Sequence, residues 1–142
     1  MGITLYKWDK LKDGYNDGGG LSLWMRTADL VKIGELLLKN GKYKDQQIVS
    51  EKWVTELFNI ENKLKASWGL KGSLHGYCWY QAKYKNEIVN YAMGYGGQYI
   101  FVFPNLDAVI AVNHNHDTAE GIEQSTLFFE KYLPLLYDTI IN

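Results

Sequence analysis

The stretch Tyr91-Ala-Met-Gly-Tyr-Gly-Gly-Gln-Tyr-Ile-Phe-Val-Phe-Pro104 predicts a strand, a glycine-rich interruption and a second strand. Glycine has no side chain to bury, and it weakens a strand in which it lies. Three glycines within four positions, Gly94, Gly96 and Gly97, therefore indicate that the backbone itself is used at this point. Either the glycines form a β-bulge, or another group approaches too closely to leave room for a Cβ atom.

The sequence around this stretch predicts an antiparallel sheet of about three to four strands. Alternating or continuous apolar runs, separated by turn residues, place strands at about Gly76 to Lys83, Ile88 to Met93, Gln98 to Phe103 and Ala108 to Asn113. Residues 59–74 are polar with scattered glycines, which is typical of a loop. Cys78 falls inside the first predicted strand, and we expect it to be a small buried hydrophobic residue.

Helices flank the predicted sheet, so the expected fold class is α+β. Apolar residues recur at helical spacing in segments that run from Thr27 to about Lys39, from Glu51 to about Phe58, and from about Gly121 onward. Thr27 and Ser50 are expected N-caps. Gly34 lies inside the first helix and indicates a close contact with a neighbouring element. Pro134 predicts either a kink or a new helix that has the proline in its first turn.

Composition narrows the class of protein. The 142 residues are enough for one domain, and fifteen basic against sixteen acidic residues give a formal net charge of −1. A balanced charge argues against nucleic acid or an anionic membrane as the main partner. The sequence shows neither a membrane-spanning run nor a signal peptide, so we expect the chain as given to be soluble. The compartment of the whole protein stays open between cytoplasmic and exported.

The residues themselves offer little catalytic chemistry. His114, His116 and Asp117 are a weak metal signal, and a hydrogen-bonded surface loop is the favoured interpretation, so no metal or cofactor is expected. No serine is followed by lysine three residues later, and none lies in a G-x-S-x-G elbow. We therefore expect no nucleophile in this chain. A backbone N–H at the glycine-rich strand end is the remaining candidate, because such a group can stabilise an oxyanion.

Several ordered motifs extend over nearly the whole chain: Met1-Gly2-Ile3, Gly18-Gly-Gly-Leu-Ser-Leu-Trp-Met-Arg-Thr-Ala-Asp-Leu-Val-Lys-Ile-Gly34, Leu38-Lys-Asn-Gly41, Gln47-Ile-Val-Ser-Glu-Lys-Trp-Val54, Gly76-Tyr-Cys-Trp79, Gly94-Tyr-Gly-Gly-Gln98 and Val102-Phe-Pro-Asn-Leu-Asp-Ala-Val109. Together they resemble the C-terminal part of serine hydrolases of the bacterial β-lactamase/penicillin-binding-protein superfamily, and especially class C-like esterases and 6-aminohexanoate-dimer hydrolases. The resemblance implies a partial β-lactamase/transpeptidase-like fold over residues 1–142, as a single C-terminal segment.

The resemblance also implies a mechanism. In this family the serine of an S-x-x-K motif attacks an ester or amide, and a Y-x-N tyrosine helps to move the proton. A third motif lines the cleft from an edge strand, and the residue after its glycine donates a backbone N–H to the oxyanion. The third-motif positions here would be Ala92, Met93, Gly94, Gly96, Gly97 and Gln98. The oxyanion donor would be the N–H of Tyr95.

Two departures from the family pattern limit the expected activity. Ala92 stands where β-lactamases have lysine or histidine, which favours ester or amide substrates over β-lactams. The family places S-x-x-K and Y-x-N before the position of Gly2, and the letters Tyr84-Lys85-Asn86 lie in the wrong region to replace them. The chain alone is then expected to be inactive. Its expected partner is the missing N-terminal part of a hydrolase or a second copy, in a homodimer or swapped assembly.

Two other functions stay open at this stage. The eleven tyrosines and five tryptophans also suit a binding module that stacks on sugar or peptide. A structural domain that dimerises through an exposed sheet edge is the third possibility.

Overall fold

The computed structural model describes residues 1–16, 23–114 and 121–142, and it contains a six-stranded antiparallel sheet. The order across the sheet is β10-β9-β8-β7-β6-β5. The strands are β5 (Leu64–Lys65), β6 (Leu74–Gly76), β7 (Trp79–Tyr84), β8 (Glu87–Gly94), β9 (Gln98–Phe103) and β10 (Ala108–Val112). The α+β class and the antiparallel sheet are confirmed, and the four longest of these strands match the predicted segments.

The sheet is wider than the sequence predicted, because β5 lies in the region 59–74 that was expected to be a loop and β6 begins at its last residue, Leu74. Both are too short, at two and three residues, to show an apolar alternation. They join the sheet through the pairing of β6 with β7, in which Leu74 faces Gln81.

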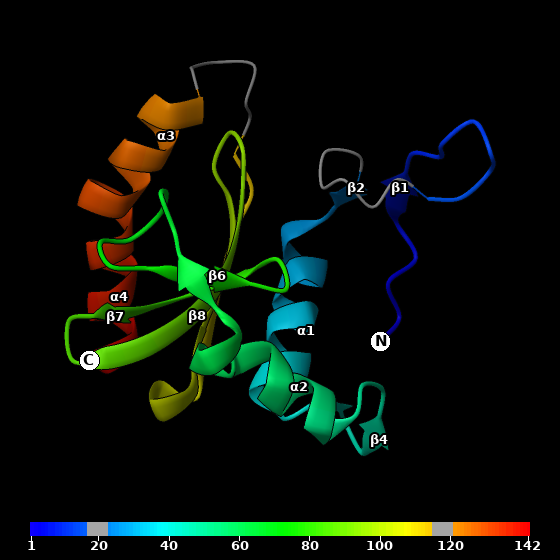
Figure 1. Ribbon diagram of the computed structural model, residues 1–142, viewed down its shortest axis with the longest axis horizontal. Coiled ribbons are helices and arrows are strands. Elements are labelled where there is room, and N and C mark those ends of the chain that lie inside the picture. The colour runs from blue at the N-terminus through cyan, green and yellow to red at the C-terminus, as the bar shows by residue number, and fades with distance from the viewer. Residues whose placement is uncertain (17–22, 115–120) are drawn as a thin grey trace.

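Helices cover both faces of the sheet (Figure 1). The helices α1 (Thr27–Leu38) and α2 (Glu51–Phe58) lie on one side. On the other side a continuous helical segment contains α3 (Gly121–Leu127), a π-helical turn (Phe128–Tyr132) and α4 (Leu133–Ile141). Pro134 lies in the first turn of α4, as one of the two sequence alternatives predicted.

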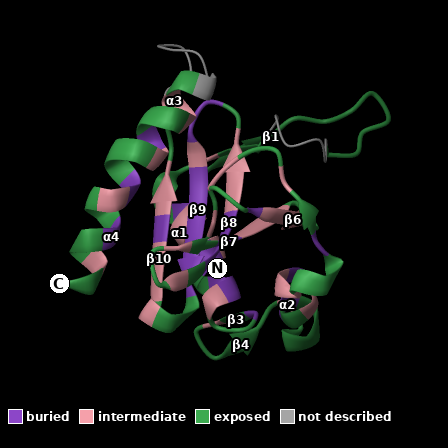
Figure 2. Ribbon diagram, turned by 60° about the vertical axis from the view of Figure 1, so that its left-hand side comes forward, coloured by how far each residue is buried: buried purple, intermediate pink, exposed green. Residues whose placement is uncertain are grey.

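Alternation along β9 connects the two faces. Tyr99, Phe101 and Phe103 point toward the C-terminal helices, where Phe128 stacks on Tyr99 with ring centroids 4.3 Å apart. Ile100 points the other way, toward Gly34 of α1. Figure 2 shows β9 buried along most of its length, as expected for a strand covered on both faces.

Gly34 allows α1 to lie directly on β10. A Cβ atom at this position would collide with the Cγ1 atom of Val109, and it would also lie 3.1 Å from a methyl carbon of Ile100. The close contact that the sequence predicted at Gly34 is therefore confirmed, and it brings the helix near to the last strand of the sheet.

The two predicted helix caps have different outcomes. Ser50 caps α2, because its Oγ accepts a hydrogen bond of 3.2 Å from the Trp53 amide. The prediction for Thr27 was wrong: Arg26 occupies the cap position of α1 and Thr27 is the first helical residue. The Thr27 hydroxyl instead accepts a hydrogen bond from Asn113, just after β10. A tertiary contact has taken the place of the local cap.

Two small hairpins complete the fold. One pairs β1 (Tyr6–Trp8) with β2 (Leu23–Met25), and it lies at the side of the molecule (Figure 1). The other pairs β3 (Lys42–Tyr43) with β4 (Gln46–Gln47) between α1 and α2. Short 3-10 turns at Ile60–Asn62 and Pro104–Leu106 connect other elements. Within the described ranges, no helix has the length and apolar character needed to cross a lipid bilayer.

Candidate functional site

The glycine-rich segment forms a tight turn between β8 and β9. Pairing of the two strands continues without interruption to Gly94 and Gln98, so the predicted alternative of a β-bulge was wrong. Tyr95, Gly96 and Gly97 make a three-residue turn, in which both glycines have positive φ angles of 86° and 91°. These angles are accessible to glycine and disfavoured for other residues, which explains the local sequence.

Gln98 and Gly97 hold this turn against the end of β10. The Gln98 side-chain amide donates to the carbonyl of His114 at 3.3 Å and to the carbonyl of Gly96 at 3.5 Å. A Cβ atom at Gly97 would lie only 3.0 Å from the His114 Cβ atom. The second sequence alternative, a close approach by another group, is therefore confirmed at Gly97. Gln98 acts here as a support of the turn.

The end of β8 is paired on one side only. Its pairing with β7 stops at Tyr91, which faces Tyr80, whereas its pairing with β9 extends to Gly94. Residues 92–94 thus form a local edge within an otherwise central strand. In an antiparallel pair, hydrogen-bonded and non-hydrogen-bonded residues alternate. At least one of these three residues must therefore turn both its N–H and its C=O away from β9, toward the open side.

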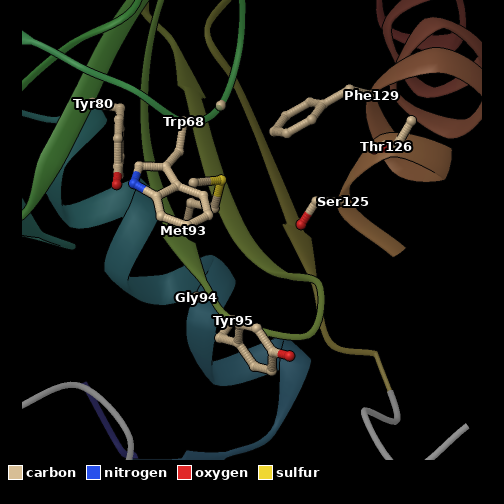
Figure 3. Close-up of a pocket in the computed structure, with 9 residues that line it drawn as sticks. Trp68, Tyr80, Met93, Gly94, Tyr95, Ser125, Thr126 and Phe129 are labelled. Atoms are coloured by element: carbon tan, nitrogen blue, oxygen red, sulfur yellow. The ribbon is translucent and has the colours of Figure 1, made fainter. Parts of the chain in front are cut away.

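A hollow with a volume of about 370 Å³ lies beside this strand end (Figure 3). Large side chains from four separate segments form most of its wall: Trp68, Tyr80, Met93 and Phe129. Gly94 and Tyr95 line it from the end of β8, and Ser125 and Thr126 line it from α3. Tyr95 is 69% exposed and lies beyond the last paired residues of the ladder.

The structure thus brings part of the predicted site together and adds residues that the sequence analysis missed. Met93, Gly94 and Tyr95 all line the hollow, whereas Gln98 supports the turn from the β9 side. Trp68 and Phe129 were not predicted, since they come from positions 25 residues before and 36 residues after Met93. No motif links such distant positions, and only the folded sheet places them side by side.

The wall of the hollow has no charge. The described residues that line it include no aspartate, glutamate, lysine, arginine or histidine. Burial raises the pKa of the Tyr80 phenol above its ordinary value, so this group also stays neutral. A site of this kind interacts weakly with ionic groups, which would lose their hydration without gaining a partner. Apolar and neutral polar groups are the chemistry that it suits.

Buried hydrogen bonds hold the loop that carries Trp68. The hydroxyl of Tyr91, which is fully buried in β8, accepts from the Leu70 amide at 3.0 Å and lies 2.5 Å from the Ser73 Oγ. Gly69 passes so close to this hydroxyl that a Cβ atom would collide with it. The wall opposite Phe129 is therefore fixed by the strand beneath it.

The serine in the hollow, Ser125, is hydrogen-bonded to a phenol. Ser125 Oγ lies 2.9 Å from the hydroxyl of Tyr99, which donates a hydrogen bond to it. Burial raises the pKa of Tyr99, so this phenol keeps its proton and does not act as a base. Ser73 is 1% exposed and so is inaccessible to a substrate. In the hydrogen bonds that join described residues, neither Ser73 nor Ser125 has a basic partner that could take its proton.

The letters Y-x-N lie far from the hollow. Tyr84 is the last residue of β7 and Asn86 lies in the turn between β7 and β8, at the opposite end of β8 from Gly94. Tyr84 packs edge-on against Tyr137 of α4, with ring centroids 5.4 Å apart. This arrangement gives Tyr84 a place in the core.

Cys78 is exposed, so the prediction that it is buried was wrong. Tyr77 and Cys78 have positive φ angles of 53° and 62° and form the two-residue turn between β6 and β7. The ammonium of Lys63, itself 7% exposed, donates to the carbonyls of Gly76 and Trp79 on either side of that turn. The apolar residues around Cys78 predicted one continuous strand, whereas the structure has a hairpin whose turn is bridged by the distant Lys63.

The predicted metal candidates are only partly described. His114 is exposed at the end of β10, whereas His116 and Asp117 lie outside the described residues. Residues 1–16, 23–114 and 121–142 contain no group of three or more potential metal ligands.

No family model matches the sequence, and no curated protein matches it significantly.

Proposed function

We propose that the chain is the C-terminal part of a serine hydrolase of the β-lactamase/penicillin-binding-protein superfamily, with a partial β-lactamase-like fold. In this role the end of β8 forms the oxyanion wall of the cleft, and the amide of Tyr95 donates to the developing negative charge. The attacking serine and its lysine come from other polypeptide. The substrate is a small ester or amide.

One observation carries this proposal: residues 92–94 are paired only with β9 and lie beside a hollow that Tyr95 also lines. A backbone donor stabilises an oxyanion best where it is fixed in advance and shielded from water. The turn that contains Tyr95 is fixed by Gln98 and His114, which supports the first requirement. Ala92, without a charge, favours a neutral substrate.

The free edge of β10 supports a partner for the chain. In the part of the sheet that the structure describes, β10 pairs only with β9, although Ala108–Val112 is apolar and contains neither proline nor charge. Natural proteins usually protect such edges. A hollow of about 840 Å³ beside it is lined by Val31 and Leu38 of α1 together with Val109. We propose that a strand of the N-terminal part of the hydrolase, or of a second copy, pairs here.

A labelling experiment separates this proposal from the alternatives. A fluorophosphonate probe is expected not to label the chain alone. Addition of a polypeptide with S-x-x-K and Y-x-N motifs from the same source is expected to restore hydrolysis of p-nitrophenyl esters. Labelling of the chain alone would contradict the absence of a nucleophile. A stable assembly that never hydrolyses esters would instead favour a structural domain that associates through β10.

A further inference from the structure

We infer that the hollow beside β8 binds an uncharged aromatic group of the substrate, so that the enzyme is selective for neutral aryl esters. This inference rests on the proposed function for its meaning in catalysis. The binding itself follows from the hollow alone, and the two can therefore fail separately.

The chemistry of the wall selects the ligand class. Trp68, Tyr80 and Phe129 present rings from three different segments, and Met93 lies beneath Trp68 (Figure 3). Aromatic rings prefer to stack or to meet edge to face, and thioether sulfur also packs well against rings. Because the described lining residues include no acidic or basic side chain, a carboxylate or ammonium group would find no charged partner among them.

The size of the hollow fits a ring with a substituent. A cavity of roughly 150 Å³ lined by apolar residues holds benzene. The volume of about 370 Å³ found here is more than twice as large. It accommodates a naphthyl group, or a phenyl ring with a short chain, and either would reach Gly94 at the end of β8.

Exposed aromatic rings at the rim of the hollow favour the binding of an apolar ligand. Trp68 is 63% exposed and Tyr95 is 69% exposed, although both are large aromatic side chains. A ligand in the hollow would remove part of their apolar surface from water, which is favourable. The hydrogen bond that the Leu70 amide donates to the Tyr91 hydroxyl, and the one between the hydroxyls of Tyr91 and Ser73, hold this side of the hollow in place before a ligand arrives.

Two matched ligands test the inference on the chain as it exists. The probes are 2-naphthyl butyrate and the mono-2-naphthyl ester of succinic acid, which has the same ring and one carboxylate. Binding is measured by chemical-shift changes of the backbone amides. The neutral ester is expected to bind at least about ten-fold more tightly, with the largest shifts at Gly94, Tyr95 and Ser125. Equal affinity, or shifts elsewhere, would overturn the inference.

A pair of tryptophan variants tests the location. Trp68→Ala is expected to weaken binding of the neutral ester about ten-fold, the magnitude of one good aromatic contact. Trp53→Ala removes another exposed ring, on α2 and outside the hollow, and is expected to leave binding unchanged. Unaltered binding in Trp68→Ala would overturn the inference.

The two proposals can be told apart in the reconstituted enzyme. Hydrolysis whose preference for naphthyl over methyl esters is unaffected by Trp68→Ala would overturn the aromatic site and leave the hydrolase proposal standing. Selective binding of the neutral ester without any hydrolysis would support the aromatic site and count against the hydrolase.

Discussion

Two of the places where the backbone of the sheet is paired on one side only have different surroundings. The end of β8, residues 92–94, opens toward a hollow lined by neutral side chains. The edge of β10 opens beside α1, where Glu35, Lys39 and Asp107 are among the lining residues. Unpaired backbone by itself thus does not define a function. The neutral surroundings suit a small ligand, whereas the long edge with charged residues beside it suits another strand.

The largest expected effect tests the backbone of β8. Tyr95→Pro removes the proposed donor, since proline has no N–H. In the reconstituted enzyme we expect the turnover number to fall about 10²–10³-fold, as for the loss of one oxyanion donor. Tyr95→Ala keeps the N–H and is expected to lose ten-fold at most.

Turnover of both variants is measured on the same p-nitrophenyl ester, with thermal unfolding as a check of the fold. Equal activity of Tyr95→Pro and Tyr95→Ala would show that this amide is not the donor. The end of β8 would then not supply the proposed oxyanion donor.

The next largest expected effect is on stability, and it concerns the buried hydroxyl of Tyr91 that holds the loop of Trp68. Tyr91→Phe removes the hydroxyl that accepts from the Leu70 amide. It also removes one hydrogen-bond partner of the Ser73 hydroxyl, which keeps its bond to the Leu70 carbonyl. We expect the free energy of unfolding to decrease by about 1–3 kcal/mol, the usual cost of such a buried loss. Urea unfolding measures it, and Tyr132→Phe on the exposed side of the C-terminal helices is the control. A neutral result for Tyr91→Phe would mean that the loop of Trp68 is held by other contacts.

A smaller effect is expected where α1 meets β10. Gly34→Ala gains helix propensity of about 1 kcal/mol but forces Val109 aside, and overpacking costs about 1–3 kcal/mol. The net expectation is a loss of about 1 kcal/mol of unfolding free energy. Glu35→Ala, an exposed neighbour, is expected to change it by less than about 0.5 kcal/mol. Stabilisation by Gly34→Ala would indicate that α1 has room to move away from the edge.

Local signals predicted the elements well, whereas distant contacts decided the site. The Ser50 cap and the strands near the glycine turn follow from neighbouring residues, and the structure contains them. Thr27 was misjudged because its hydroxyl bonds to the distant Asn113. Cys78 was misjudged because it lies in a tight turn, whose flanking carbonyls accept from the distant Lys63. The hollow combines segments that no spacing connects. Of its lining residues, only those on the β8 side were predictable from sequence.

The smallest expected effect concerns the charged residues beside the edge of β10. Lys39, the residue directly after α1, forms an ion pair with Asp107, and both side chains are more than half exposed. Exposed pairs contribute about 0–1 kcal/mol and are screened by salt. We expect a double-mutant cycle of Lys39→Ala and Asp107→Ala to give a coupling under about 1 kcal/mol that vanishes in 1 M salt. A similar value is expected for the exposed pair Lys85 and Asp138, which lies away from β10.

A clearly larger, salt-resistant coupling for Lys39 and Asp107 would mean that this pair closes the edge, because screening by water and ions would then be absent. In that case the ion pair would cover the edge of β10, and a partner strand would have to break the pair before it could bind.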